Sequence, residues 1–140
     1  MKRPKVIVLC GSSRFADVMA VVAWLLERDE GAITMGIHFL PWWYTPPGVE
    51  PGESWDHGAE LEGVASQMDD LHLRKIDLVD EVFVVDVGGY VGESTRREIA
   101  YAEQRGLPVR YFSCWALGAQ ITALHDAAAA IESAKSGVRG

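Results

Sequence analysis

The sequence of 140 residues has little cysteine, no long apolar run and no excess of basic charge. Its two cysteines, Cys10 and Cys114, form no C-x-x-C motif, which argues against a disulfide framework and favours a reducing compartment. The apolar run that follows the basic N-terminus, 6–10, is too short for a signal peptide, and no stretch is long enough to span a membrane. We therefore expect a cytoplasmic protein with no membrane partner.

The acidic balance and the missing motifs exclude several classes of function. A net charge of −7 and a pI of about 5.0 argue against binding to a nucleic acid polymer, although a small anion remains compatible with local dipoles and a few arginines. The dinucleotide fingerprint G-x-G-x-x-G and the P-loop pattern are both absent. Asp56-His57 is too little for a metal site, because ligand spacings such as H-x-x-x-H are missing. We expect neither a metal nor a cofactor.

Apolar runs alternate with segments of helical period along the chain. The expected strands are 6–10, 32–40, 81–87 and 109–112, and the expected helical segments are 15–28, 61–79, 95–105 and 117–131. This alternation predicts an α/β fold, a single-domain Rossmann-like or flavodoxin-like three-layer sandwich with a parallel sheet of four or five strands. The strands 6–10 and 81–87 should be adjacent at its centre. The domain should cover 1–140, with 136–140 as a frayed tail.

In such sheets ligands bind beyond the carboxyl ends of the strands. The first expected strand leads into Gly11, Ser12, Ser13 and Arg14, a turn that offers backbone N–H groups, hydroxyls and a guanidinium to an anion. The alternative is an ordinary helix cap, since serine is a favoured N-cap residue. The sequence leaves both interpretations open.

A second glycine-rich turn follows the strand 81–87 and leads into a helix. Its glycines allow the backbone to approach a ligand, and the N–H groups of the helix start favour phosphate. Glu98 should lie one turn into that helix and face the ligand. The alternative is a capping box, Thr95-x-x-Glu98, in which Glu98 only bonds the start of the helix. The candidate substrate contacts of this segment are Asp86, Gly89, Tyr90, Gly92 and Ser94.

Aromatic residues and one histidine complete the candidates. Trp42, Trp43 and Tyr44 lie in a long irregular loop, where they can stack a base, cover the core or form a dimer contact. Five tryptophans are more than a small domain easily buries, which favours a homodimer or larger assembly. His72 shares its apparent helix face with Met68 and Leu71, so a packing role is the alternative to a catalytic one.

The turn residues and the helix 93–102 carry a resemblance to a known family. The strand 6–10 with Gly11-Ser12, the strand 80–85 and the run Glu93-Ser94-Thr95-Arg96-Arg97-Glu98-Ile99-Ala100-Tyr101-Ala102 together resemble the nucleoside 2-deoxyribosyltransferase family, which includes the nucleoside 5'-monophosphate N-glycosidases. The similarity covers roughly 5–112, with a poorly aligned middle. It implies that Glu98 is the nucleophile, that Ser94 contacts the 5' end of the sugar, and that Gly11-Ser12 forms part of the pocket floor.

A weaker resemblance points to the same chemistry. Cys10-Gly11-Ser12-Ser13 and Gly88-Gly89-Tyr90-Val91-Gly92 are similar to motifs of the lysine-decarboxylase-like phosphoribohydrolases, with Val87 in place of that family's proline. Both families imply cleavage or transfer of the N-glycosidic bond of a nucleoside or nucleotide.

One departure from the transferase family concerns the acid that protonates the leaving base. By its distance from Asp80, His72 occupies the position of an aspartate in that family, and Asp70 is nearby. Both are therefore candidates for the acid. The alternative function is a non-catalytic domain that binds a nucleotide or a nucleotide-derived signal.

Overall fold

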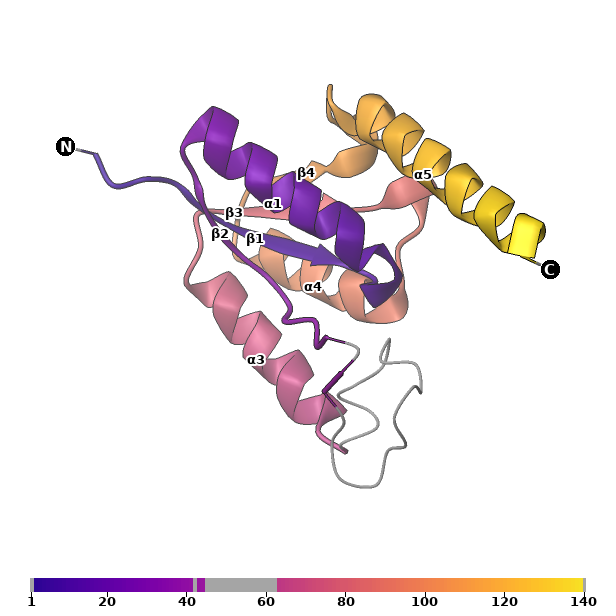
Figure 1. Cartoon of the computed structure of the whole chain (residues 1–140). Helices are drawn as coiled ribbons and strands as arrows, with labels where there is room; N and C mark the ends of the chain where they lie inside the picture. The colour runs from indigo at the N-terminus through magenta and orange to yellow at the C-terminus, as the bar shows by residue number, and fades with distance from the viewer. Residues whose placement is uncertain (1, 42, 45–62, 140) are drawn as a thin grey trace.

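The computed structural model describes residues 2–41, 43–44 and 63–139, with side chains to 136. Its centre is a four-stranded parallel sheet in the order β2-β1-β3-β4 (Figure 1). The strands are β1 (Val6–Gly11), β2 (Ile33–Met35), β3 (Glu81–Val85) and β4 (Val109–Tyr111). The prediction of an α/β sandwich is confirmed, and β1 and β3 are neighbours at the centre with Leu9 opposite Phe83.

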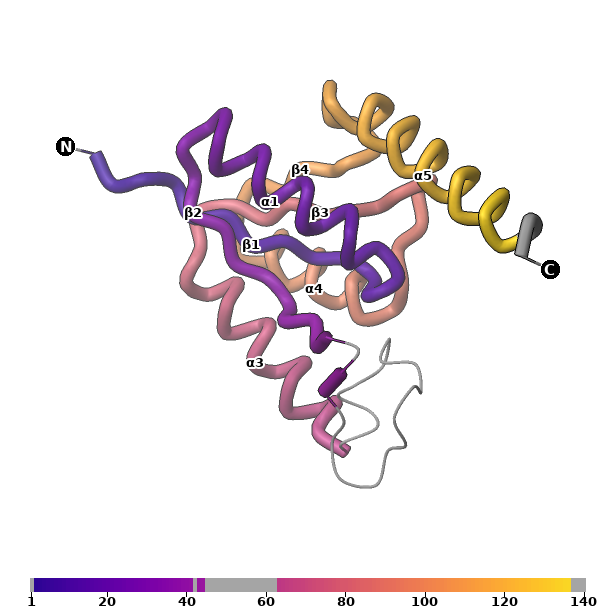
Figure 2. Tube along the Cα trace, in the orientation of Figure 1, coloured from indigo at the N-terminus to yellow at the C-terminus, as the bar shows by residue number. Residues whose placement is uncertain are grey.

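Helices cover both faces of this sheet. On one face lie α1 (Ala16–Glu30) and the first turns of α5 (Gly118–Arg139), and on the other lie α3 (Ala65–Asp77) and α4 (Glu93–Gln104). The rest of α5 extends beyond the sheet (Figure 1), and the two ends of the described chain lie on opposite sides of the molecule (Figure 2). In the described part of the chain, no helix is both long and apolar enough to cross a membrane.

Strand alternation assigns the residues of β1 to the two cores. Ile7 and Leu9 belong to the core beneath α1, whereas Val8 and Cys10 belong to the core beneath α3 and α4. Successive side chains of a strand point to opposite faces, so this division follows from the sequence order alone. Cys10 therefore faces the two helices that carry His72 and Glu98.

Element boundaries differ from the expected ones in places. The second strand is shorter than predicted and ends at Met35, directly before Gly36, a residue that is unfavourable in strands. Helix α4 begins at Glu93, two residues earlier than expected, because Gly92 has an extended conformation and serves as the N-cap. The backbone of α5 continues to Arg139, and the fraying of 136–140 stays a prediction.

Candidate functional site

Two loops at the carboxyl edge of the sheet meet through Arg14 and Tyr90. The Arg14 guanidinium lies 4.2 Å from the centre of the Tyr90 ring, a cation–π contact. Ser12 accepts a hydrogen bond of 3.3 Å from the backbone N–H of Arg14, so it caps the short turn Ser13–Phe15. Ser13, partly buried, is the first residue of that turn. A β-carbon at position 11 would lie 3.0 Å from the backbone oxygen of Val85, a close approach that favours glycine there.

The turn after β3 depends on two consecutive glycines. Gly88 and Gly89 have φ angles of 64° and 80°, in the left-handed region that favours glycine. This conformation reverses the chain and places Tyr90 against Arg14. Gly92 then leads into α4. The glycines thus have a clear backbone role, and their contact with a substrate stays a prediction.

Asp86 holds neighbouring loops together. It is buried, and its carboxylate accepts hydrogen bonds of 2.9 Å from the backbone N–H and 2.7 Å from the hydroxyl of Ser113. These bonds attach the end of β3 to the turn that follows β4. Since each oxygen has a partner, the structure shows Asp86 in a supporting role, and a substrate contact by Asp86 stays a prediction.

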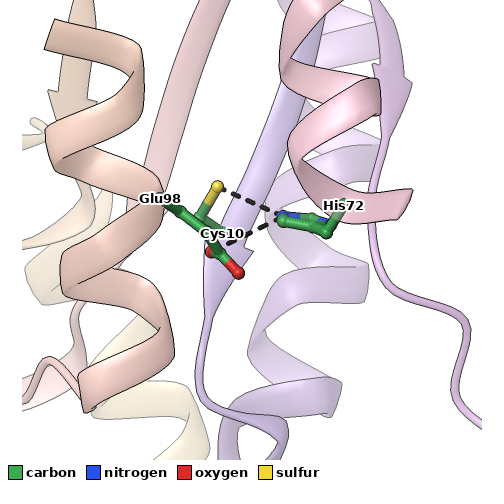
Figure 3. A group of neighbouring side chains, drawn as sticks. All are labelled: Cys10, His72 and Glu98. Atoms are coloured by element: carbon green, nitrogen blue, oxygen red, sulfur yellow. Dashed lines mark hydrogen bonds and ion pairs between the residues drawn. The ribbon is translucent and has the colours of Figure 1, made fainter. Parts of the chain in front are cut away.

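Glu98 lies in the second turn of α4 and is only 6% exposed. Its Oε2 atom lies 3.6 Å from Nε2 of His72, and the same Nε2 lies 3.4 Å from Sγ of Cys10 (Figure 3). Because Gly92 is the N-cap of α4 and no side chain caps the helix, the capping box between Thr95 and Glu98 is absent. The capping alternative for Glu98 is therefore wrong.

Burial shifts the three side chains toward their neutral forms. It raises the pKa of Glu98 to about 7, against a smaller opposing effect of a hydrogen bond with Cys10. It lowers the pKa of His72 to about 4 and raises the pKa of the Cys10 thiol. Among the residues that the structure describes, Nδ1 of His72 and Oε2 of Glu98 are buried and have no hydrogen-bond partner. His72 is therefore not a satisfied packing residue, and Met68 and Leu71, expected on its face, are half exposed.

A pocket opens beside this group between the middle of α3 and the N-terminal half of α4. It is lined by Asp69, Leu73, Ser94, Arg97 and Glu98. Arg97 donates a hydrogen bond of 3.3 Å to the Ser94 hydroxyl and lies 3.7 Å from the Asp69 carboxylate. Ser94 and Glu98, which the resemblance assigns to opposite ends of one sugar, thus line the same pocket.

The remaining candidates lie in other places. Asp70 is exposed on α3, and the lining of this pocket does not include it. Trp43 and Tyr44 are exposed, and Trp42 lies outside the described residues. The aromatic pocket and the convergence of Ser12, Ser13, Arg14 and Ser94 on one anion both stay predictions.

Three residues of the site were not expected from the sequence. In the sequence Cys10 belongs only to a turn motif, Asp69 is only a neighbour of the candidate acid Asp70, and Arg97 has no predicted role. The available signal was periodicity. Arg97 and Glu98 follow Ser94 by three and four residues on one helix, and His72 and Leu73 follow Asp69 by three and four residues on the other, so each pair lies one turn after the residue that begins its set.

Comparisons with protein-family models, with curated proteins and with solved structures found no match. The function must therefore be inferred from the chemistry of Cys10, His72 and Glu98 and of the pocket beside them.

Proposed function

We propose that this protein cleaves or transfers the N-glycosidic bond of a nucleoside or nucleoside 5'-monophosphate, with Glu98 as the nucleophile. One observation carries the proposal. The Glu98 carboxyl group is buried and lines a pocket shared with Ser94 and Arg97, and one of its oxygens has no hydrogen-bond partner in the described part of the chain. Keeping a carboxylate in this environment costs stability, and such perturbed groups are concentrated at functional sites.

In the first step a Glu98 oxygen attacks C1' of the sugar as the bond between C1' and the base nitrogen breaks. The electron pair of that bond leaves with the base, and the transition state has oxocarbenium character. The product is an ester between Glu98 and the sugar. The carboxylate is the attacking form, and a pKa of about 7 makes it available near neutral pH.

In the second step water attacks C1' and regenerates the Glu98 carboxylate, or a second base attacks and forms a new N-glycosidic bond. Two displacements at C1' retain its configuration. Neither step needs an oxidant or a reductant, because both exchange one bond at C1' for another.

His72 serves this mechanism as a positioning residue for Glu98. Its Nε2 atom lies 3.6 Å from the carboxylate, and its pKa of about 4 keeps the ring neutral at the pH where Glu98 is ionised. A neutral imidazole can donate one hydrogen bond without adding charge. In this proposal the leaving base takes its proton from water.

The start of α4 suits the 5' end of the substrate. No side chain caps this helix, so its first N–H groups are available to an anion, and the helix dipole favours negative charge there. Ser94 and Arg97 add a hydroxyl and a positive charge, and Asp69 partly offsets that charge. Because this end of the pocket favours a negatively charged group, the proposed substrate is a nucleoside 5'-monophosphate rather than a nucleoside.

The test incubates the protein with a panel of nucleosides and 5'-monophosphates in the presence of EDTA. Chromatography then measures the free base that is released. Glu98→Gln keeps the shape of the side chain but cannot form the ester, so we expect the rate to fall by at least about a thousandfold. Glu103→Gln is the matched control, because Glu103 is an exposed glutamate on the same helix.

Two outcomes would contradict the proposal. Base release by Glu98→Gln at most of the wild-type rate would exclude the nucleophile. Tight binding of a nucleotide by the wild-type protein with no base release across the panel would favour the non-catalytic binding domain.

A further inference from the structure

The three buried polar side chains of the site have the composition of a metal-ligand set. Cys10, His72 and Glu98 offer a thiol sulfur, an imidazole nitrogen and a carboxylate oxygen, and these ligand atoms all lie within 4.8 Å of one another (Figure 3). They come from β1, α3 and α4, three elements that pack around one core. Thiolate, imidazole and carboxylate are the three ligand types of protein zinc sites.

Two of the three separations between these atoms are close to those across a tetrahedral zinc ion. With zinc bonds of about 2.3 Å to sulfur and about 2.0–2.2 Å to nitrogen and oxygen, the ligand atoms of such a site are about 3.4–3.6 Å apart. The observed separations are 3.4 Å between Cys10 Sγ and His72 Nε2 and 3.6 Å between His72 Nε2 and Glu98 Oε2.

An unpartnered oxygen provides a second, independent indication of a ligand. Glu98 is more than nine-tenths buried, and its Oε2 atom, which lies 3.6 Å from His72 Nε2, has no hydrogen-bond partner within the described ranges 2–41, 43–44 and 63–136. Buried polar atoms are normally paired, so an unpaired one indicates a missing partner. A cation between Oε2, Nε2 and Sγ would supply it.

We propose that Cys10, His72 and Glu98 bind a zinc ion, with a fourth coordination position open to the pocket lined by Asp69, Ser94 and Arg97. Three protein ligands and one open position are the arrangement of an accessible zinc site. Binding releases the thiol proton of Cys10, and any proton on Glu98, to solvent, since zinc binds the thiolate and the carboxylate. This binding does not depend on the proposed function.

Zinc at this position would inhibit the proposed glycosidase, and this second part of the proposal rests on that function. The metal takes the Glu98 oxygen that would otherwise attack C1'. It also occupies the wall of the pocket that would hold the sugar. The occupied protein should therefore release no base until a chelator removes the ion.

The test is titration of the EDTA-treated, desalted full chain with Co²⁺, which reports on coordination by its visible spectrum, followed by displacement with Zn²⁺. We expect one ion per chain, intense d–d bands of a four-coordinate ion, and a thiolate-to-cobalt charge-transfer band in the near ultraviolet. Cys10→Ala should lose the charge-transfer band. Cys114→Ala, which removes the other, exposed cysteine, should keep it.

The affinities provide the second readout. Changes outside the ligand set typically weaken a metal site roughly 10–100-fold, so loss of a direct ligand in Cys10→Ala should weaken Zn²⁺ binding at least that much. Glu98→Gln, which is nearly isosteric, should also weaken it and serves as the second variant if Cys10→Ala fails to fold. Wild-type affinity in both variants, or a spectrum without the charge-transfer band in the wild-type protein, would overturn the zinc site.

The two parts of the proposal fail in different ways. If cobalt binds as expected while Zn²⁺ leaves base release unchanged, the predicted inhibition is wrong, whereas the predicted metal site is supported. If the metal-free protein releases no base from any substrate, the proposed function fails, and the cobalt spectrum still decides the metal site.

Discussion

The two faces of the central sheet are built very differently. The core beneath α1 is a cluster of apolar side chains, including Leu26 and Phe83, and the buried Glu81, two residues before Phe83 on β3, has an ion-pair partner in Arg110. The core beneath α3 and α4 is apolar near Ile76 but places His72, Glu98 and the Cys10 thiol close together near the end of β1. Both sets of side chains are almost wholly removed from solvent.

This difference indicates a division of tasks between the faces. Apolar burial beneath α1 stabilises the fold by roughly 25 cal/mol for each Å² removed from water. Burial of His72 and Glu98 opposes folding, because each loses hydration without a full set of hydrogen bonds. Perturbed buried groups are concentrated at functional sites, which supports the proposed site on the α3 and α4 side.

The sharpest test of the comparison removes one buried side chain from each face. Leu26→Ala should lower the free energy of unfolding by about 2–5 kcal/mol, because it leaves a cavity under α1. Glu98→Gln should leave stability equal or higher at pH 8, since it replaces a buried charge with a neutral amide. Urea unfolding of both variants measures the difference. Equal losses of unfolding free energy in the two variants would contradict the proposed division of tasks between the two faces of the sheet.

The pH dependence of stability should separate His72 from Glu98. The pKa of His72 falls from 6.5 to about 4 on folding, so the unfolded chain binds more protons there and stability rises with pH between these values. The pKa of Glu98 rises from 4.5 to about 7, so the folded chain binds more protons there and stability falls with pH over that range. The two effects oppose each other from about pH 4.5 to 6.5.

A variant that lacks one of the two groups should show how the other group changes stability with pH. Glu98→Gln leaves the His72 effect, and its stability should rise with pH by up to about 3 kcal/mol. His72→Asn leaves the Glu98 effect, and its stability should fall with pH by a similar amount. Thermal or urea unfolding from pH 4 to 8 measures both. If stability changed with pH in the same direction in both variants, the opposite pKa shifts of His72 and Glu98 would be contradicted.

Base release should depend on the ionisation of Glu98. Because the attacking form is the carboxylate, the rate should rise about tenfold per pH unit below about pH 7 and level off above it. At pH 5 the rate should be about one hundredth of the plateau. Initial rates in EDTA at saturating substrate measure this profile. A rate that falls between pH 5 and 7 would indicate that protonated Glu98 is the active form.

The smallest expected change concerns the outer side of the apolar face. Helix α5 has an apolar stripe, of which Ile121 packs on the core while Leu124 and Ile131 are more than half exposed. Trp24 on α1 is also exposed. We expect these side chains to contact a second copy of the chain, because monomers seldom leave such a stripe uncovered.

Leu124→Glu should therefore shift a homodimer toward the monomer in light scattering, with a change in monomer stability within about 0.5 kcal/mol. Gln120→Glu is the control, since Gln120 is an exposed polar residue of the same helix. A wild-type protein that is monomeric at micromolar concentration would contradict the expected contact.

Local patterns determined much of this architecture. Continuous apolar runs marked β1 and β3 as central strands, and helical spacing marked α1, α3 and α4 to within about four residues, because burial on one or both faces imposes these periods. Helix α5 continues to Arg139, beyond the expected end at 131. The length of β2 and the start of α4 could not be predicted from local patterns. They depend on strand pairing and on the extended backbone of Gly92, which a periodic pattern does not encode.

The sequence by itself also singled out Glu98, Ser94 and the two turns at the carboxyl edge, because a parallel sheet must bring those strand ends together. Only the tertiary structure decided that Cys10 touches His72, which is 62 residues away, and that both adjoin Glu98. Those contacts depend on how α3 and α4 pack across β1. The spacing of residues along the sequence does not determine this packing. The pKa of Glu98 was likewise decided by burial, which belongs to the folded chain and not to the residue.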